Sequence, residues 1–222
     1  MNILQYIYYF FRSIRYRGFI FTLKLLYFEF YYERKLGIKT LQIANLESLN
    51  TINNDYENNH HYQGASYYVL SILFKKIKKY STDKTFIDYG CGKGRVLIMA
   101  ALEGFDPIKG IDLAKELCEI SLTNIERVRT KIGNTKIEVV QADATNYTSI
   151  DDIHIFFFFN PFGRLVMNQV VNQIEQSKLR NPRTVYIIYV NPLYVDCFIH
   201  ANYEVLEEIH SKEYTEGIIL KK

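Results

Sequence analysis

The sequence predicts an α/β fold in which a mostly parallel, seven-stranded sheet ends in an antiparallel hairpin and follows a helical N-terminal extension. Three observations lead to this expectation. Short apolar runs alternate with helical patterns from residue 85 onward. The first four runs each end in a polar residue, and the last two, residues 203–210 and 214–220, are separated by only three residues. Alternating strands and helices are typical of parallel sheets, whereas so short a connection permits only an antiparallel pair.

The strongest single feature is a glycine-rich turn within residues 85–101, T-F-I-D-Y-G-C-G-K-G-R-V-L-I-M-A-A. An apolar run ends in Asp88, three glycines follow at alternate positions, and a run of helix formers begins at Val96. Strand, tight turn and helix N-terminus in this order are typical of a nucleotide-binding unit, because glycines allow close approach and the first helical N–H groups are unpaired. The spacing G-x-G-x-G differs from the dinucleotide pattern, so NAD is the second choice of ligand, and no P-loop is present.

Three further apolar runs end in residues suited to the same site. Residues 107–111 precede Asp112, residues 137–141 precede Ala-Asp-Ala, and residues 153–159 precede Asn-Pro-Phe. Because the carboxyl ends of parallel strands meet at one edge of a sheet, these residues are expected to line one crevice. The acid at 112 follows the glycine turn by roughly 20 residues, where a ribose-binding acid belongs.

The segments D-Y-G-C-G-K-G-R, G-I-D-L, Q-A-D-A and F-N-P-F resemble the four motifs of class I S-adenosylmethionine (SAM)-dependent methyltransferases, over residues 62–222. Within that superfamily they are most similar to a poorly characterised bacterial group with the patterns DxGxGKGR and FNPF. They are more distantly similar to the non-SET lysine methyltransferases. The resemblance implies a Rossmann-like sheet and SAM as cofactor. It also implies an enzyme that methylates an acceptor, most readily an amino group of a protein or small molecule.

The resemblance implies that the cofactor-binding residues come from a tyrosine before the first helix of the domain, the glycine turn and the following strand ends. They are Tyr62, Asp88, Gly90, Cys91, Gly92, Gly94, Arg95, Asp112, Leu113, Asp143, Ala144 and Asn160. Asp88 would attract the ammonium group, and Asp112 would accept from both ribose hydroxyls. Leu113 would lie against the adenine face, Asp143 would accept from the adenine amine, and the Ala144 N–H would meet a ring nitrogen. Carboxylates only accept hydrogen bonds, which suits these roles.

Two residues of the turn have alternative readings. Arg95 begins a helix, where a cation opposes the helix dipole, so it is expected to have a partner. That partner is the cofactor's carboxylate or a nearby acid, and a solvated side chain is the alternative. Cys91 is expected to be a small filler in a crowded turn rather than a nucleophile.

Asn160, Pro161 and Phe162 are the predicted catalytic residues, since they resemble the N-P-P-[FY] loop of amino-group methyltransferases with one proline missing. Proline favours an extended conformation at Asn160, which would aim its amide and the next carbonyls into the crevice. Phe162 would then wall the pocket. Because the second proline is absent, a carboxylate, hydroxyl or thiol acceptor stays open, and so does a purely structural turn.

Residues 1–61 are predicted to be a helical extension followed by an Asn-rich linker, and residues 62–222 the methyltransferase domain. The first 40 residues are aromatic and basic, and they predict two helices broken near Gly18. These helices either pack on the domain or lie in a membrane interface through residues 1–32. The expected location is the cytoplasm, with peripheral contact at the inner membrane face as the alternative.

Composition narrows the classes of function and of binding site that the sequence allows. A formal net charge of +3 in 222 residues is far from the strongly basic field of a dedicated nucleic-acid binder. The three cysteines, Cys91, Cys118 and Cys197, have no metal-ligand spacing, so neither a metal site nor a disulfide framework is expected.

Two alternatives to an amine methyltransferase stay open. One is a nucleic-acid methyltransferase, suggested by Arg12, Arg15 and Arg17 and by the lysines at 75, 76, 78 and 79. The other is a non-catalytic SAM-binding or membrane-associated module.

Overall fold

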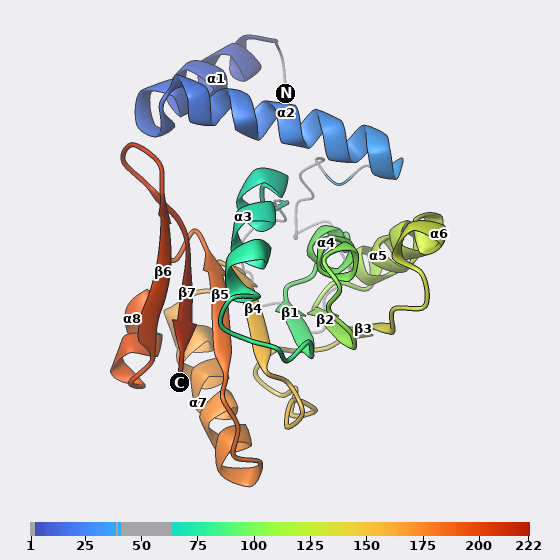
Figure 1. Cartoon of the computed structure of the whole chain (residues 1–222), viewed down its shortest axis with the longest axis vertical. Coiled ribbons are helices and arrows are strands. Elements are labelled where there is room, and N and C mark those ends of the chain that lie inside the picture. Colours follow the sequence, from blue (N-terminus) through green and yellow to red (C-terminus); the bar gives the residue numbers. More distant parts are fainter. Residues whose placement is uncertain (1–2, 39, 41–63) are drawn as a thin grey trace.

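The computed structural model describes residues 3–38, 40 and 64–222, with side chains from Ile7 onward. Figure 1 shows the elements in chain order. The helices are α1 (Ile3–Arg17), α2 (Phe19–Leu36), α3 (Tyr67–Ile77), α4 (Arg95–Leu102), α5 (Lys115–Arg127), α6 (Arg129–Ile132), α7 (Arg164–Arg180) and α8 (Val195–His200). The strands are β1 (Phe86–Tyr89), β2 (Ile108–Asp112), β3 (Ile137–Gln141), β4 (Ile155–Phe159), β5 (Tyr186–Val190), β6 (Glu204–His210) and β7 (Thr215–Lys221).

The strands form one seven-stranded sheet in the order β3-β2-β1-β4-β5-β7-β6. Strands β1 to β5 are parallel, and β7 lies between β5 and β6, antiparallel to both. Asp88 of β1 is in register with Gly110 of β2 and Phe157 of β4. The predicted fold class is therefore confirmed, including the C-terminal antiparallel hairpin.

Two hydrophobic layers cover the two faces of the sheet. Phe157 of β4 packs with α3 and α4 on one face, whereas Phe156 and Phe158 pack with α7 and α8 on the other. The strand I-F-F-F-F is thus buried on both sides, as a central parallel strand must be. These phenylalanines form the core, so they are not available as a stacking surface for a ligand.

One predicted helix differs from the structure. The sequence predicts a continuous helix over residues 115–131, but α5 ends at Arg127 and the short α6 begins at Arg129. Between them Val128 leaves the helical conformation, with φ −104° and ψ 8°, and its side chain is fully buried. Burial of Val128 in the core accounts for the break, because tertiary packing overrides helix propensity.

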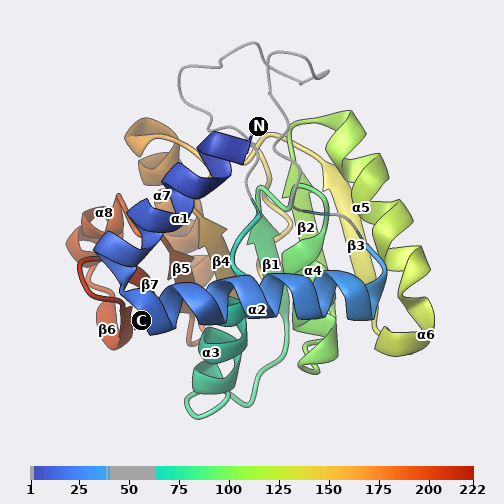
Figure 2. The same ribbon diagram turned by 90° about the horizontal axis from the view of Figure 1, so that it is seen from above.

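The N-terminal helices lie across the carboxyl edge of the sheet, as Figures 1 and 2 show. Gly18 separates them with φ 85°, which confirms the predicted break. Phe21 and Phe28 of α2 pack edge-on against Tyr68 of α3, with ring centroids 5.3 and 5.0 Å apart. Arg17 pairs with Glu216 of β7 at 2.5 Å. One face of α2 thus packs on the body of the protein.

Among the described helices, none is both long and apolar enough to cross a membrane.

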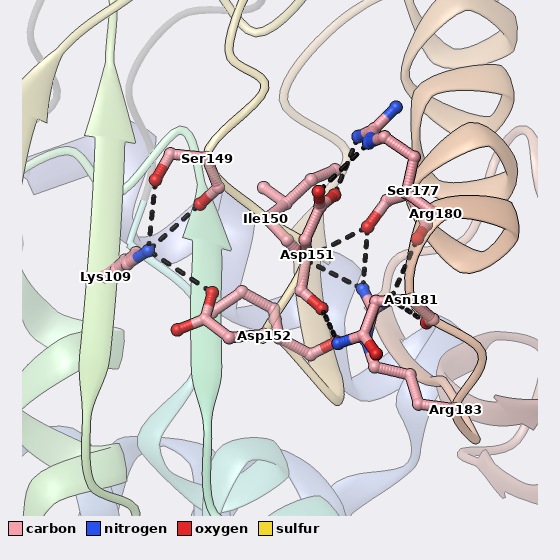
Figure 3. Close-up of polar contacts among 10 residues, drawn as sticks. Lys109, Ser149, Ile150, Asp151, Asp152, Ser177, Arg180, Asn181 and Arg183 are labelled. Carbon is pink, nitrogen blue, oxygen red and sulfur yellow. Dashed lines mark hydrogen bonds and ion pairs between the residues drawn. The ribbon is translucent and has the colours of Figure 1, made fainter.

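A polar cluster fixes the opposite, amino edge of the sheet (Figure 3). Arg180 donates to both oxygens of Asp151 at 2.7 and 3.0 Å, and these hydrogen bonds lower the pKa of Asp151 to about 2. Arg183 donates to the carbonyl oxygen of Ile150 at 2.8 Å, and Lys109 donates to that of Ser149 at 3.0 Å. These contacts tie the loop before β4 to β2 and to the end of α7, so the cluster is a structural one.

Candidate active site

The glycine turn between β1 and α4 is bonded to the end of β2. The N–H groups of Gly90 and Cys91 both donate to the Ile111 carbonyl oxygen at 2.9 Å. The Gly92 N–H donates to Asp112 Oδ2 at 2.8 Å. The first two predicted motifs therefore form one rigid unit at the carboxyl edge of the sheet.

Two glycines of the turn are required by their surroundings as well as by their backbone. A Cβ at Gly90, where φ is 79°, would lie 2.8 Å from Pro161 Cβ. A Cβ at Gly94, where φ is 80°, would lie 2.4 Å from Ser121 Oγ of α5. Absence of these side chains lets the Asn-Pro-Phe segment after β4 and the helix after β2 approach the turn. The structure thus brings Pro161, predicted from the fourth motif, against the first motif.

Two buried carboxylates occupy this junction. Asp112 is nearly buried, and its Oδ1 accepts from the Ala114 N–H at 3.0 Å while Oδ2 accepts from Gly92. Asp88 is 2% exposed, and its Oδ2 has no hydrogen-bond partner among the described residues. Burial, together with the nearby Asp112, raises the pKa of Asp88 well above its usual value. Burial also raises the pKa of Asp112, although backbone N–H groups oppose that shift. A cationic group placed beside Asp88 would relieve the burial of its charge.

The third strand end contributes a turn in which Asp143 binds Thr145. Asp143 Oδ1 accepts from the backbone N–H of Thr145 at 2.8 Å and from its hydroxyl at 2.7 Å. Ala144 is buried beside this turn, and half-buried Leu113 follows β2, with its carbonyl oxygen accepting from Gln141 of β3 at 3.1 Å. The adenine contacts predicted for Leu113, Asp143 and Ala144 therefore come from neighbouring strands, and they stay predictions.

The backbone of Asn160 differs from the prediction. Proline at 161 favours an extended conformation for the preceding residue, yet Asn160 has φ 42°, in the left-handed region. Asparagine tolerates this region better than most residues. The buried side chain is held by Tyr189 of β5, whose hydroxyl donates to Asn160 Oδ1 at 3.3 Å. Burial raises the pKa of Tyr189, so the hydroxyl keeps the proton that it donates.

The side chains beside Asn160 have separate positions. Phe162 is buried, and its ring meets that of Phe158 edge-on at 6.3 Å, within the core layer beneath α7. Pro161 is half-buried against the glycine turn. Phe162 therefore anchors the segment in the core, and its predicted role as a pocket wall stays a prediction.

Arg95 binds nearby acids, which was one of the predicted alternatives. The side chain is 2% exposed, and Nη1 lies 2.9 Å from Glu29 Oε2 while Nη2 lies 3.4 Å from Glu33 Oε1. Nη1 also donates to the Ala65 carbonyl oxygen at 2.8 Å, and the guanidinium lies 4.1 Å above the Tyr67 ring. The solvated alternative is therefore wrong. Contact of this side chain with the cofactor stays a prediction.

Cys91 and Tyr62 complete the predicted set. Cys91 is buried, and burial together with the two nearby aspartates raises the pKa of its thiol well above the usual value. A thiol that stays protonated is a poor nucleophile, consistent with the prediction of a small filler. Tyr62 lies outside the described residues.

Sequence reasoning did not find three residues that support the site. Glu29 and Glu33 of α2 bind Arg95, and Tyr189 orients Asn160. The two glutamates lie 66 and 62 residues before Arg95, so no local spacing connects them with the glycine turn. The available signal was the position of Tyr189 near the carboxyl end of its strand, Y-I-I-Y-V, because that end lies at the same edge of the sheet as the glycine turn.

No protein-family model and no curated protein matches the sequence. The fold is similar to that of a candidate RNA methyltransferase from Pyrococcus horikoshii, with TM-score 0.52 and 18% identity over 79% of this chain and 90% of that one. It is also similar to a candidate methylase from Haemophilus influenzae, with TM-score 0.51 and 16% identity over 69% and 86% of the two chains. A third similar structure is the tRNA (uracil-54, C5)-methyltransferase of Pyrococcus abyssi in complex with S-adenosyl-L-homocysteine. Its TM-score is 0.50, with 17% identity over 82% of this chain and 44% of that one. These likenesses show that the chain has the class I methyltransferase fold.

Proposed function

We propose that the protein transfers a methyl group from SAM to an acceptor, most readily an amino group of a protein or a small molecule. The observation that carries this proposal is the pair of buried carboxylates at the glycine turn, one with an unpartnered oxygen. This pair fits a ligand that presents a cation and a diol, as SAM does through its ammonium group and its ribose. The insertion of β7 between β5 and β6 also departs from the dinucleotide-binding order, in which β6 follows β5 directly.

The residues present fit the cofactor. Asp112 retains acceptor capacity for the ribose hydroxyls, since each carboxylate oxygen has more than one lone pair. Asp88 offers the ammonium group its Oδ2, which has no partner among the described residues, and the exposed main chain at Gly90 would allow close approach. Leu113 would contact the adenine face, and Asp143 with the Ala144 N–H would bind its edge.

The bound cofactor supplies a methyl group activated by a positively charged sulfur. The protein has to align the acceptor atom with the methyl carbon and the sulfur, and such positioning contributes several kcal/mol in general. Asn160 would accept hydrogen bonds from the acceptor amine through Oδ1, which has a second lone pair besides the one that Tyr189 uses. The Pro161 carbonyl oxygen is the second predicted acceptor. Both would direct the nitrogen lone pair toward the methyl carbon.

Thermal unfolding with S-adenosylhomocysteine beside NAD tests the cofactor. A ligand at 100 times its dissociation constant adds ~2.7 kcal/mol, which raises the midpoint of a chain of this size by roughly 5–10 °C. We expect this shift with S-adenosylhomocysteine and none with NAD. The Asp112→Ala variant is the matched control and should lose the shift, because it removes both predicted ribose contacts. A shift with NAD alone would overturn the proposal.

Replacing Asn160 with alanine should separate methyl transfer from cofactor binding. We expect the turnover number to fall by about 100-fold, because removal of one transition-state hydrogen-bonding group typically has an effect of that order. The affinity for S-adenosylhomocysteine should stay within about two-fold, since the group acts on the acceptor. The measurement is the initial rate of S-adenosylhomocysteine formation with the best acceptor from a panel of primary amines. Equal rates for variant and wild type would exclude Asn160 from the reaction.

RNA methylation is a second candidate, because two of the similar structures are named as RNA or tRNA methyltransferases. Two lysines at the end of α3 that suggested a nucleic-acid surface are paired with acids: Lys76 with Glu207 and Lys78 with Glu103, each at 2.5 Å. This pairing weighs against a phosphate-binding surface at these two lysines, whereas Arg12 and Arg15 of α1 stay exposed. Salt-dependent binding of tRNA at low ionic strength would instead support the second candidate.

A further inference from the structure

The outer face of the two N-terminal helices concentrates exposed apolar side chains. Nineteen large hydrophobic side chains are exposed among the described residues, and eleven of them lie on α1 and α2. On α2, Phe19, Leu23, Tyr27 and Phe30 follow at intervals of three or four residues, which places them on one side of the helix. Phe30 is 80% exposed. Contiguous apolar patches of this kind mark interaction surfaces.

Exposed cations accompany this apolar face. Every arginine and lysine of α1 and α2 except Arg17 is exposed, and these residues are Arg12, Arg15, Lys24, Arg34 and Lys35. The helices contain only two acids, Glu29 and Glu33, and both are directed inward to Arg95. The outward surface therefore carries positive charge without acidic side chains of its own.

The helix pair is attached firmly to the body of the protein. The Glu213 N–H, between β6 and β7, donates to the Tyr16 carbonyl oxygen at 2.9 Å, and Lys212 donates to that of Arg15 at 3.2 Å. With the Arg17–Glu216 pair, these contacts hold α1 against the β6–β7 hairpin. Figure 2 looks onto this surface, with both helices nearest the viewer. The surface is thus a fixed platform over the carboxyl edge of the sheet.

We propose that this platform, the outer face of α1 and α2, docks the protein on an anionic phospholipid membrane. Phenylalanine, leucine and tyrosine side chains would enter the interface between headgroups and acyl chains, where aromatic residues are favoured. Four of the exposed cations, Arg12, Arg15, Arg34 and Lys35, would bind the anionic headgroups, which attract basic side chains near the surface. Lys24 lies over the Tyr68 ring of α3, at the edge of the platform. The charge pattern selects this occupant, because an outward face with cations and no acids complements a uniformly negative surface. A second copy of the same face would oppose cations to cations.

Co-sedimentation of the full chain with vesicles tests this proposal and does not depend on methyl transfer. We expect binding to vesicles of phosphatidylcholine mixed with phosphatidylglycerol, weakening with salt, and little binding to phosphatidylcholine alone. Exposed Ile20 and Phe30 can be replaced without disturbing the core. The affinity of the Ile20→Ser/Phe30→Ser variant for these vesicles should fall by about ten-fold or more, because the variant removes two inserted side chains. The Arg12→Gln/Arg34→Gln variant should lose the preference for anionic vesicles.

Leu179→Ser is the matched control, since Leu179 is 74% exposed on α7 at the other end of the molecule. This variant should bind vesicles as the wild type does. Three outcomes would overturn the proposal: no binding to anionic vesicles at low salt, equal weakening by the control, or a stable dimer in light scattering. If that dimer dissociated with Ile20→Ser/Phe30→Ser, the platform would instead be an interface between two copies of the chain.

Discussion

Replacing Arg95 with methionine is expected to lower the thermal midpoint of the protein by roughly 6–20 °C. The change keeps the apolar stem but leaves Glu29 and Glu33 without the cation that both carboxylates bind. Removing one partner of a buried ion pair typically costs about 3–5 kcal/mol, because the remaining charge is uncompensated. A midpoint shift of about 2–4 °C per kcal/mol applies to a chain of this length. Differential scanning calorimetry gives the measurement.

The same substitution at Arg180 is the control, because the Arg180–Asp151 pair is about half exposed and solvent screens it. Arg180→Met should change the midpoint far less than Arg95→Met. Adding Glu29→Gln to Arg95→Met should recover part of the loss, since it removes one of the two uncompensated charges. Equal effects at the two arginines, or no recovery in the double variant, would show that the buried cluster does not stabilise the fold.

Acidification should also reduce the Arg95→Met deficit. Burial already raises the pKa of Glu29 in the folded protein, with Arg95 opposing the shift, and removal of Arg95 strengthens it. An acid with a raised pKa binds more protons in the folded state than in the unfolded state, so its contribution to stability falls as the pH rises. The variant should therefore be nearest to the wild type at the acidic end of the pH range in which both are folded.

Replacing Asp88 with asparagine is expected to change stability and cofactor affinity in opposite directions. Asparagine has the same shape but no charge, so the ligand-free protein should gain about 1–3 kcal/mol by losing a buried carboxylate whose Oδ2 has no partner in the described part of the chain. Affinity for S-adenosylhomocysteine should fall by about 10- to 100-fold, because a charge-assisted hydrogen bond to the ammonium group is lost. Calorimetric unfolding without ligand and titration with ligand measure the two effects.

The pH dependence of the wild type follows from the same carboxylate. The raised pKa of Asp88 means that the folded, ligand-free protein loses stability as the pH rises from the ordinary value of 3.8 toward the raised one. Binding of an ammonium group favours the ionised form, so cofactor affinity should increase over that same range. Asp88→Asn should weaken both trends and leave the part of the stability trend that the raised pKa values of Asp112 and Glu29 cause, whereas Asp152→Asn, at a carboxylate that is 61% exposed, should change neither. Retention of both trends in Asp88→Asn would assign them to another group.

The sequence carried enough information to place the strand ends of the site, because local patterns determine them. Each apolar run ends in its polar residue, and the positive φ angles at Gly90 and Gly94 match the turn that their spacing predicted. The left-handed conformation of Asn160 was not predicted, because the rule that residues before proline are extended describes an average preference. Tyr189 comes from the neighbouring strand, so the contact that holds Asn160 follows from sheet order rather than from local sequence.

The partners of Arg95 could not be predicted from the sequence for a related reason. An arginine at a helix N-terminus predicts some partner, but which partner depends on how α2 crosses the sheet. That placement is set by packing of α2 against α3, between segments separated by the residues outside the described part of the chain. Propensity and spacing do not encode such long-range docking.

The order in which the chain is synthesised gives the buried Arg95 cluster a further consequence. The helices α1 and α2 leave the ribosome before α4, since Arg95 follows Glu29 by 66 residues. Until α4 is made, both glutamates lack the cation that they bind. Docking of the helices therefore completes only after the glycine turn exists. Fixing α1 takes longer still, because its partners Lys212, Glu213 and Glu216 come after all the other described helices and strands except β7 itself. The outer platform of α1 and α2 is therefore completed only when the β6–β7 hairpin has joined the sheet.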